Sequence, residues 1–482
     1  MNSDTILTQT PEKGSLRFVI LVSLVAALGG FLFGFDTSVM SGANGYLRLR
    51  FGLGDAMLGW TVSCIIIGCI AGAAFAGMMG NRYGRKRVLI VSALLYIIGI
   101  GGSALAGGLV PFIALRMLEG VAIGINCSLC PMYNAEIAPA KYRGRLVAMT
   151  QMATVTAILS GMLLSYFIAG AGNEAWNITS GWRFMFGAGV VPGTLFLILL
   201  FFVPESPRWL IQKGRAEEAL PILLRIHGNT AARQEVLDIK RSFAEETKLS
   251  FGEAARQLMK GKTRKILVIG TIVAMTQQIT GINAVMYYAP EIFRQTGSGT
   301  SGSLLQTLLV GVVNVVFTAL SLWLVDKLGR KLLLLIGSGV MTVSLLLIGV
   351  SFELGQTGGV VIIVCILAYV AAFAVSLGAV VWVLLAEMFP NRIRGVATAI
   401  ANMALWAMNF VVSQSFPSLL SSIGPGKTFW IYGAAALFTF LFTMSQVPET
   451  KGKSLEEIEA MWEKNHASLA DERGFAPSLQ EN

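Results

Sequence analysis

Twelve long apolar runs constrain this chain more than any other feature of its sequence. Crossing the hydrocarbon core of a bilayer takes about 20 helical residues, and the runs reach that length. They cover approximately residues 17–40, 57–79, 88–107, 111–133, 146–170, 183–203, 266–289, 303–325, 332–353, 359–386, 395–419 and 428–447. Only 13% of the residues are charged, whereas a soluble protein carries charge on about a quarter of them. The sequence therefore predicts an all-α membrane protein with twelve transmembrane helices.

The interval between the sixth and seventh runs has a different character. Residues 204–265 hold 21 of the 64 charged residues, so we expect this linker to lie in water. Within it, residues 215–226 and 231–246 have the apolar spacing of short amphipathic helices, which we expect on a membrane-facing surface. The predicted organisation is a six-helix bundle over residues 1–203, the linker, a second six-helix bundle over 266–447 and a cytoplasmic tail over 448–482.

Basic residues in the short loops predict the orientation of the chain in the membrane. Lys and Arg prefer the cytoplasmic side, and the loops after even-numbered runs carry twelve of them against five in the opposite loops. We therefore expect both termini and the linker in the cytoplasm, and the short outer loops fit a bacterial inner membrane. The net charge of +10 is then a result of this topology, and we expect no nucleic-acid partner.

Reactive side chains do not gather inside the runs. The five cysteines lie in apolar segments, where they act as small packing residues. Cys127 and Cys130 form a C-x-x-C pair, but no second ligand pair lies nearby. Both histidines, His227 and His466, lie outside the runs, which excludes a histidine proton relay. We expect no metal, no cofactor and no enzymatic activity, because no nucleophile, base and orienting group occur together in the runs.

Short motifs in the first half recur in the second half in the same order. Residues 82–86 (RYGRK) recur as 327–331 (KLGRK), and residues 135–144 (AEIAPAKYRG) recur as 386–395 (AEMFPNRIRG). The Pro-Glu-Ser of residues 204–206 recurs as the Pro-Glu-Thr of 448–450. We therefore predict two related six-helix bundles in parallel orientation, the architecture in which a central site opens alternately to either side of the membrane. The pairs Gly68-x-x-x-Gly72 and Gly120-x-x-x-Gly124 predict close helix packing.

The repeated motifs also place arginines beside acidic residues at helix ends on one face of the membrane. For each single arginine, a role only in setting topology is an alternative. As a repeated set, the residues predict an ion-pair network that holds the two bundles together on the cytoplasmic side in one conformation. Exposed pairs are worth only about 0–1 kcal/mol each, so such a network can break during a transport cycle. Its predicted members are Arg82, Arg85, Glu136, Arg143, Glu205, Arg208, Arg330, Glu387, Arg392, Arg394 and Glu449.

Two charged residues lie within the apolar runs at similar predicted depth. Asp36 is in the outer part of the first run, and Arg116 is about five residues into the fourth. Charges inside a membrane are costly and mark functional sites by default, and a carboxylate beside a partner of opposite charge is a candidate proton carrier. The alternative is a permanent ion pair that holds two helices together. Glu119, three residues after Arg116, lies on the same helix face.

Several motifs together identify a family. The chain resembles the sugar porter family of the major facilitator superfamily over essentially its whole length, and within it the bacterial xylose/proton symporters. The resemblance rests on GRK at 84–86 and 329–331, PESPRWL at 204–210, QQITGINAVMYYAP at 277–290 and PETKGKSLEEIE at 448–459. It implies a twelve-helix fold and sugar transport by alternating access. Proton-coupled members have Asp at the position of Asp36, and Arg116 matches the arginine that modulates it, whereas Glu119 stands where relatives usually have a small residue.

Sugar hydroxyls both donate and accept hydrogen bonds, so a sugar site needs amides and aromatic surfaces. In the seventh run, Gln278 and Asn283 are five residues apart and can both reach a ligand if the helix is unwound near Gly281; hydrogen bonding between helices is the alternative role. The resemblance implies the sugar ligands Gln151, Gln277, Gln278, Asn283, Asn314 and Trp382, the cavity residues Trp406 and Asn409, and an outer gate of Tyr287 and Tyr288.

Four positions depart from the pattern of the xylose symporters. Ile158 and Leu405 replace polar residues, so xylose specificity does not carry over, and Ala379 and Val381 stand near Trp382 where relatives often have proline. We expect a monomeric proton-coupled importer of a pentose, a hexose or an inositol. The alternatives are a facilitative uniporter in which Asp36 is structural, and a sugar sensor, which would need a signalling tail longer than the roughly 34 residues after the last run.

Overall fold

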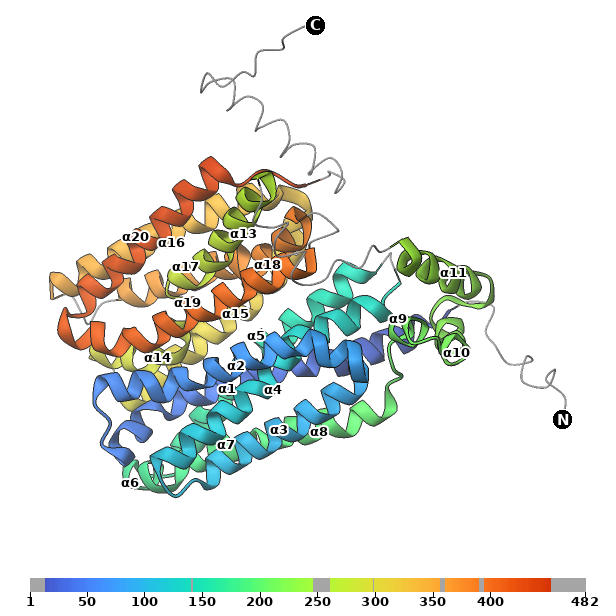
Figure 1. Ribbon diagram of the computed structural model, residues 1–482. Coiled ribbons are helices and arrows are strands. Elements are labelled where there is room, and N and C mark those ends of the chain that lie inside the picture. Colours follow the sequence, from blue (N-terminus) through green and yellow to red (C-terminus); the bar gives the residue numbers. More distant parts are fainter. Residues whose placement is uncertain are drawn as a thin grey trace, which may run out of the picture.

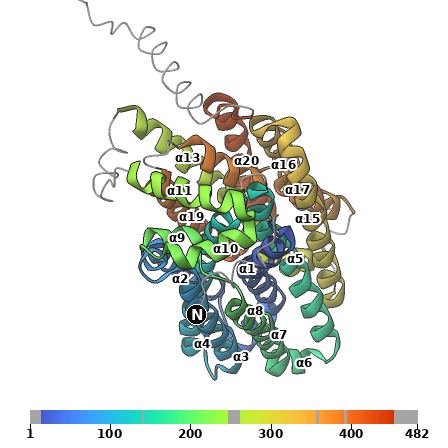
Figure 2. The ribbon, with the colours of Figure 1, turned by 90° about the vertical axis from the view of Figure 1, so that its right-hand side faces the viewer.

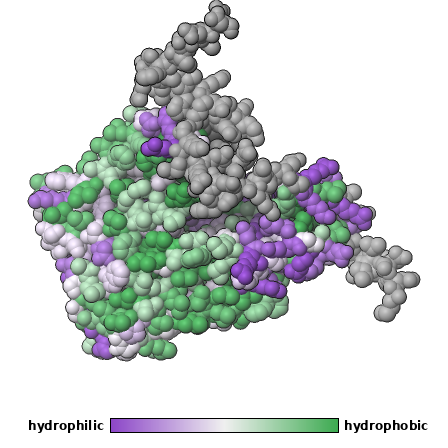
Figure 3. All heavy atoms as spheres, in the orientation of Figure 1, coloured by the Kyte–Doolittle hydropathy of each residue, from purple (hydrophilic) through white to green (hydrophobic). Residues whose placement is uncertain are grey.

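The computed structural model describes residues 14–139, 142–245, 261–297, 299–355, 360–389 and 394–451. Within these ranges, twelve helical segments are long and apolar enough to cross a membrane. The prediction of twelve spans is confirmed, and the predicted and observed bounds agree to within a few residues for most of them. On the face that Figure 3 shows, apolar side chains cover the middle of the bundle, and hydrophilic ones gather where the linker helices lie.

The spans form two halves that lie side by side (Figure 1). The first half contains α1 (Leu16–Phe51), α2 (Asp55–Tyr83), α3 (Arg85–Leu105), α4 (Leu109–Ile137), α5 (Arg143–Gly170) and a sixth span made of α6 (Glu174–Trp176), a π-helical turn (Asn177–Gly181), α7 (Trp182–Ala188) and α8 (Val190–Phe202). The second half contains α13 (Gly261–Ile279) with α14 (Ile282–Gln295), α15 (Thr300–Leu328), α16 (Arg330–Glu353), α17 (Val360–Val375) with α18 (Leu377–Met388), α19 (Arg394–Ser422) and α20 (Pro425–Gln446).

Three linker helices, α9 (Pro207–Gln212), α10 (Ala216–His227) and α11 (Asn229–Glu245), lie at one end of the bundle, which we call the linker end (Figure 2). The opposite end is the far end. The start of the described chain is at the linker end, where the Ser15 N–H donates to the Arg225 carbonyl at 2.8 Å. The other described end returns there, because Lys451 Nζ donates to the carbonyl of Lys327 at the close of α15. An even number of spans requires this arrangement.

The two predicted amphipathic helices coincide with α10 and α11 to within two residues. Their apolar faces differ from the expectation of a membrane-facing surface. They pack against α9 and against each other, around a small cluster of buried residues that includes Trp209, Leu223 and Ala232. Trp209 Nε1 also donates to the Asn81 carbonyl at the end of α2, at 3.0 Å. Packing within the linker therefore accounts for the amphipathic spacing.

The crossing of α2 and α4 depends on the two glycine pairs that the sequence singles out. A Cβ atom at Gly68 would lie 2.1 Å from the Met117 carbonyl oxygen, and one at Gly124 would lie 2.1 Å from the Cys69 carbonyl oxygen. Gly72 and Gly120 are equally close to the facing backbone. The prediction of close helix packing is confirmed, and this contact brings α4 and its charged residues into the interior of the first half.

Two spans of the second half are broken near their middles. Gly281, at φ 88°, separates α13 from α14, as a left-handed backbone that favours glycine does. Ser376, at φ −112° and ψ −96°, separates α17 from α18, and its hydroxyl donates to the Ala372 carbonyl at 2.6 Å. The tenth span is therefore broken at a serine and not at a proline, and the serine hydroxyl donates a hydrogen bond to a backbone carbonyl beside the break.

The two halves meet at the far end. Asn44 Nδ2 on α1 donates to the Tyr287 carbonyl on α14 at 2.6 Å. Ser63 Oγ on α2 donates to Gln414 Oε1 on α19 at 2.8 Å, and Gln414 Nε2 donates to the Ala56 carbonyl at 3.0 Å. These contacts close the far end of the interface in this conformation.

Candidate functional site

A cluster of three charged side chains lies buried in the first half. Arg116 on α4 is 0% exposed, Asp36 on α1 is 1% exposed and Glu119 on α4 is 0% exposed. Arg116 Nη1 donates to Asp36 Oδ1, and Nη2 donates to Asp36 Oδ2 at 3.2 Å. Arg116 Nη1 also lies 3.0 Å from Glu119 Oε2. The structure thus brings the predicted pair together and adds Glu119 as a second carboxyl on the same guanidinium.

Asp36 lies nearer the middle of its helix than the first apolar run indicates. The first apolar run ends near residue 40, but α1 continues to Phe51 and ends at Gly52, which adopts a left-handed conformation at φ 61°. Asp36 is therefore near the middle of a 36-residue helix rather than in its outer part. The helix outlasts the apolar run because Ser41, Asn44 and their neighbours are buried against other helices.

Apolar and aromatic side chains surround the cluster. The Arg116 guanidinium lies over the Phe186 ring of α7, 5.3 Å from its centroid, in the geometry of a cation–π contact. Gly99 on α3 faces Glu119 so closely that a Cβ there would lie 2.8 Å from the Glu119 Cα. Tyr96, on the same helix, is fully buried. Water is thereby excluded from the cluster on the sides formed by α3 and α7.

The three predicted sugar ligands of the seventh span form a chain of hydrogen bonds at the helix break. Gln277 Nε2 donates to the Leu377 carbonyl at 2.9 Å, Gln278 Nε2 donates to Gln277 Oε1 at 3.1 Å, and Asn283 Nδ2 donates to Gln278 Oε1 at 2.7 Å. The break at Gly281 lets side chains five residues apart meet, as expected for a locally unwound helix. We call these three hydrogen-bonded side chains the amide chain. Because Leu377 begins α18, the amide chain also joins the two broken spans.

The other predicted substrate residues lie on four further helices. Gln151 is half-buried on α5, Asn314 is buried on α15, and Trp382 is 40% exposed on α18. On α19, Trp406 packs edge-on against Phe33 of the first half at 5.6 Å, and Asn409 Oδ1 accepts from Ser413 at 3.1 Å. Among the described residues, these five side chains make no hydrogen bond to the amide chain, so the structure does not join them into one site.

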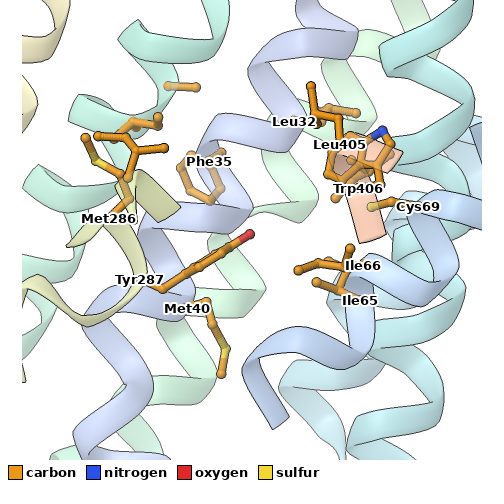
Figure 4. Packing of buried hydrophobic residues seen from close by; sticks show 14 of the residues in the cluster. Leu32, Phe35, Met40, Ile65, Ile66, Cys69, Met286, Tyr287, Leu405 and Trp406 are labelled. Carbon is orange, nitrogen blue, oxygen red and sulfur yellow. The ribbon is translucent and has the colours of Figure 1, made fainter. Parts of the chain in front are cut away.

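The two predicted gate tyrosines are both buried. Tyr287 lies at the interface between the halves, where its carbonyl accepts from Asn44, whereas Tyr288 packs within the second half. Figure 4 shows the Tyr287 ring between α1 and α2, with its hydroxyl directed toward the side of Ile66 and Cys69. Tyr288 donates its hydroxyl to the Ser413 carbonyl on α19 at 3.0 Å. Tyr288 also departs from helical geometry, at φ −117° and ψ 15°, two residues before Pro290. The residues implied as an outer gate therefore lie where the far end is closed.

The repeated motifs form matching ion pairs at the linker end of each half. Arg85 Nη2 lies 2.8 Å from Glu136 Oε1 in the first half, and Arg330 Nη2 lies 2.8 Å from Glu387 Oε1 in the second. Glu205 accepts from the backbone N–H of Arg85 at 2.9 Å. The sequence-based expectation that these pairs hold the two halves together is wrong for this conformation: each of them lies within one half.

Glu449 occupies the position in the second half that Glu205 has in the first. It accepts from the backbone N–H groups of Arg330 and Lys331, each at 3.0 Å. Burial alone would raise the pKa of the Glu449 carboxyl, but the hydrogen bonds from the backbone of Lys451, Arg330, Lys331 and Thr450 outweigh it, so the pKa is lowered. The carboxylate thus caps the N-terminus of α16, where unpaired N–H groups favour negative charge.

The remaining network candidates have other surroundings. Arg82 lies over the neighbouring Tyr83 ring, at 5.2 Å, and Arg208 lies over the Phe243 ring of α11, at 5.3 Å. Arg143 is exposed at the start of α5. Arg392 and the side chain of Arg394 lie outside the part of the chain that the structure describes.

Sequence reasoning missed the polar residues that close the far end. Asn44 lies beyond the end of the first apolar run, so hydropathy does not place it in a transmembrane helix. Gln414 lies in the eleventh run, but its bond partners, Ser63 and the Ala56 carbonyl, are on a different half. The only available signal was the polar side chains themselves within apolar surroundings, which mark contacts between helices.

Comparison with known proteins places the chain among transporters. The sequence model of the family described as "Sugar (and other) transporter" matches residues 22–462. The chain is 42% identical to the arabinose-proton symporter of Bacillus subtilis, over 93% of this chain and 96% of that protein. It is also 42% identical to the D-xylose-proton symporter of Escherichia coli, over 92% and 96%. A solved structure of the xylose transporter XylE from E. coli, in a partially occluded inward open conformation, superposes with a TM-score of 0.81 at 40% identity, over 91% of this chain and 100% of that one.

Proposed function

The chain belongs to the sugar transporter family, and we propose that it is a symporter that couples the movement of a monosaccharide to that of protons. The observation that carries the proposal is the buried contact between Asp36 and Arg116 inside the membrane-spanning region. A buried ion pair alone is weak evidence for stability, because desolvation opposes it. A role for the Asp36 carboxyl in binding and releasing a proton during transport accounts for its position there.

Sugar recognition is assigned to the amide chain at the break in the seventh span. Gln277, Gln278 and Asn283 offer N–H donors and carbonyl acceptors in the arrangement that a ring of hydroxyls requires. Their present hydrogen bonds to one another keep the polar atoms paired without a ligand, and a sugar would replace them. Gln151, Asn314, Trp382, Trp406 and Asn409 are proposed as the further contacts that a sugar makes once the halves close around it.

The present conformation is proposed to be the inward-facing state. The contacts of Asn44 and Gln414 across the interface lie at the far end, and the basic loops predict that the linker end is cytoplasmic. Residues 1–203 and 266–447 would act as the two bundles that rock about the central site, with Tyr287 and Tyr288 as the outer gate. We propose a bacterial inner membrane and a monomer in the lipid bilayer as the working form.

The substrate class is a pentose, a hexose or an inositol. The relatives named above carry arabinose and xylose in their names. The apolar side chains of Ile158 and Leu405, both buried, remove hydrogen-bonding partners at two positions of the implied pocket. Competition for uptake of a radiolabelled sugar by a panel of pentoses, hexoses and inositols, with and without a protonophore, identifies the substrate.

The variant Asp36→Asn tests the coupling. We expect it to abolish accumulation of sugar against its gradient while sugar counterflow continues, because the neutral amide cannot carry a proton. Asp238→Asn, at an exposed position on α11, is the matched control and should accumulate sugar as the unmodified protein does. Unchanged accumulation by Asp36→Asn would instead support the alternative of a uniporter in which Asp36 is structural.

A further inference from the structure

We propose that Glu119 is a second proton-binding residue, and that it and Asp36 hold one proton between them in this conformation. This inference rests on the proposed proton coupling and deepens it, because it names a carboxyl that neither the family match nor the named relatives assign. The observations that carry it are the burial of Glu119, its contacts and the charge of its surroundings.

The charges of the cluster do not balance if both carboxyls are ionised. Among the described residues, Arg116 is the single cation in contact with Asp36 and Glu119, and all three side chains are at most 1% exposed. Two carboxylates and one guanidinium leave a net charge of −1 in a buried site. Like charges that share a buried site cannot both ionise readily, so the cluster becomes neutral by keeping one proton.

The other titratable groups that face Glu119 do not supply a compensating charge. They are neutral thiols and a phenol: Cys64 and Cys69 on α2 and Tyr96 on α3. From α7, the contact with the cluster is the apolar ring of Phe186. Tyr287 of α14, near Asp36, adds another phenol. The groups named here are all neutral, so Arg116 alone among them offsets the two carboxyls.

The contacts of the Glu119 carboxyl also favour a proton at the cluster. Glu119 Oε2 lies 3.0 Å from Arg116 Nη1, the same nitrogen that donates to Asp36 Oδ1, so the two carboxyls are held on one guanidinium nitrogen. An ionised carboxylate only accepts hydrogen bonds, whereas a protonated one donates. A proton on either carboxyl therefore supplies an O–H donor and removes the repulsion between two carboxylates on one nitrogen. Within the described residues, the buried Oε1 of Glu119 has no hydrogen-bond partner, so it is an unpaired acceptor in this proton-binding pair.

The transport step then differs from that of a single carboxyl beside an arginine. In the loaded state the cluster holds one carboxylate, one carboxylic acid and one guanidinium, with no net charge. Loss of the proton to water at the linker end leaves two carboxylates on Arg116, and uptake of a proton from the far end restores the acid. Glu119 therefore increases the affinity of the pair for the transported proton, and proton-driven uptake persists to a more alkaline pH than it would without Glu119.

The variant Glu119→Gln tests this, because it keeps an oxygen acceptor for Arg116 and removes the charge. In proteoliposomes we expect the pH at which proton-driven uptake falls to half to move toward acid by about 1–3 units, the range over which a nearby like charge acts. Glu119→Asp should keep the profile near that of the unmodified protein. Glu218→Gln, which removes the acid of an exposed i,i+3 Arg–Glu pair on α10, is the matched control. Sugar counterflow reports whether each variant folds.

An unchanged pH profile in a Glu119→Gln variant that performs counterflow would overturn the proposal. If that variant does not fold, infrared spectroscopy of the unmodified protein decides. We expect the absorption of a protonated carboxyl group near neutral pH and its loss in Asp36→Asn, where Glu119 can ionise against Arg116 alone. Absence of that absorption in the unmodified protein would also refute the proposal. Absence of proton-driven uptake by the unmodified protein would refute the proposed function. The infrared measurement would still test whether Asp36 and Glu119 share a proton.

Discussion

The hydrogen bonds across the far end predict how strongly the closed conformation is favoured there. Three hydrogen bonds between described residues join the halves there: Asn44 to the Tyr287 carbonyl, Ser63 to Gln414, and Gln414 to the Ala56 carbonyl, at 2.6, 2.8 and 3.0 Å. When the far end opens, water replaces them, so each contributes only its net worth of about 1 kcal/mol. Removing all three should favour opening by about 2–3 kcal/mol, which is roughly a 30- to 150-fold change in the equilibrium.

The double variant Asn44→Ala/Gln414→Ala removes all three bonds. Spin labels on cysteines introduced at Met57 and Ser421, which are exposed at the far ends of α2 and α19, measure the separation of the halves there, in a background without the native cysteines. We expect the distance distribution to gain a long-distance population. Each single variant should give a smaller gain, with Gln414→Ala larger than Asn44→Ala because it loses two bonds.

The control for this experiment breaks a bond within one half. Asp55→Asn weakens the contact of Asp55 with Arg48, which joins α1 to α2 at the far end at 2.7 Å. It should leave the distance distribution unchanged. If the double variant also leaves it unchanged, the far-end hydrogen bonds do not hold the halves together and the reasoning is refuted.

Three further predictions concern single positions. Gly281→Ala places a Cβ at φ 88° and 2.8 Å from the Tyr432 ring, which costs at least about 1–2 kcal/mol, and isothermal calorimetry should find weaker sugar binding. Gly124→Ala places a Cβ 2.1 Å from the Cys69 carbonyl oxygen, so overpacking of about 1–3 kcal/mol should lower the melting temperature. The pKa of the Glu449 carboxyl is below its ordinary value of 4.5, so the ionised carboxylate stabilises the folded protein above pH 4.5, and this stabilisation is lost as the pH falls through the lowered pKa. Over this pH range, the melting temperature of Glu449→Gln should therefore fall less than that of the unmodified protein.

Each of these has a control or a contradicting outcome. Gly170→Ala, at an end of α5 where a Cβ would meet nothing within 4 Å, should leave both binding and melting unchanged. Sugar affinity that is unaltered in Gly281→Ala would mean that the helix break does not position the amides. A Gly124→Ala protein as stable as the original would mean that α2 and α4 can separate at no cost. Equal acid sensitivity of Glu449→Gln and the original protein would exclude the carboxylate cap as its source.

Hydrophobic runs were sufficient to predict which segments span the membrane, because a span must satisfy its backbone internally and cover itself with apolar side chains. They were insufficient where polar residues are buried between helices. The segment from Ser41 to Arg50 continues α1 although its composition resembles a loop. The break at Gly281 was predictable from glycine and the spacing of Gln278 and Asn283. Serine has no such backbone preference, so the break at Ser376, which packs against Gly337, was not.

The buried cluster was partly predictable from depth and spacing. Asp36 and Arg116 were expected to form a pair because an unpaired charge inside a membrane is costly. Glu119 was expected near them because it lies three residues after Arg116, on the same helix face. Contacts between the halves were not predictable in the same way. The same sequence must stabilise an inward-facing and an outward-facing arrangement, so motifs such as those of Arg85 and Arg330 do not specify which partners they have in one state.

Movement of protons with sugar is the most direct test of the account. Addition of a transported sugar to lightly buffered proteoliposomes should raise the external pH, because each sugar that enters takes protons with it, and the Asp36→Asn variant should produce no such rise while it still exchanges sugar. Entry of sugar into vesicles with the unmodified protein and no accompanying change of pH would contradict the central claim that this transporter is a proton symporter.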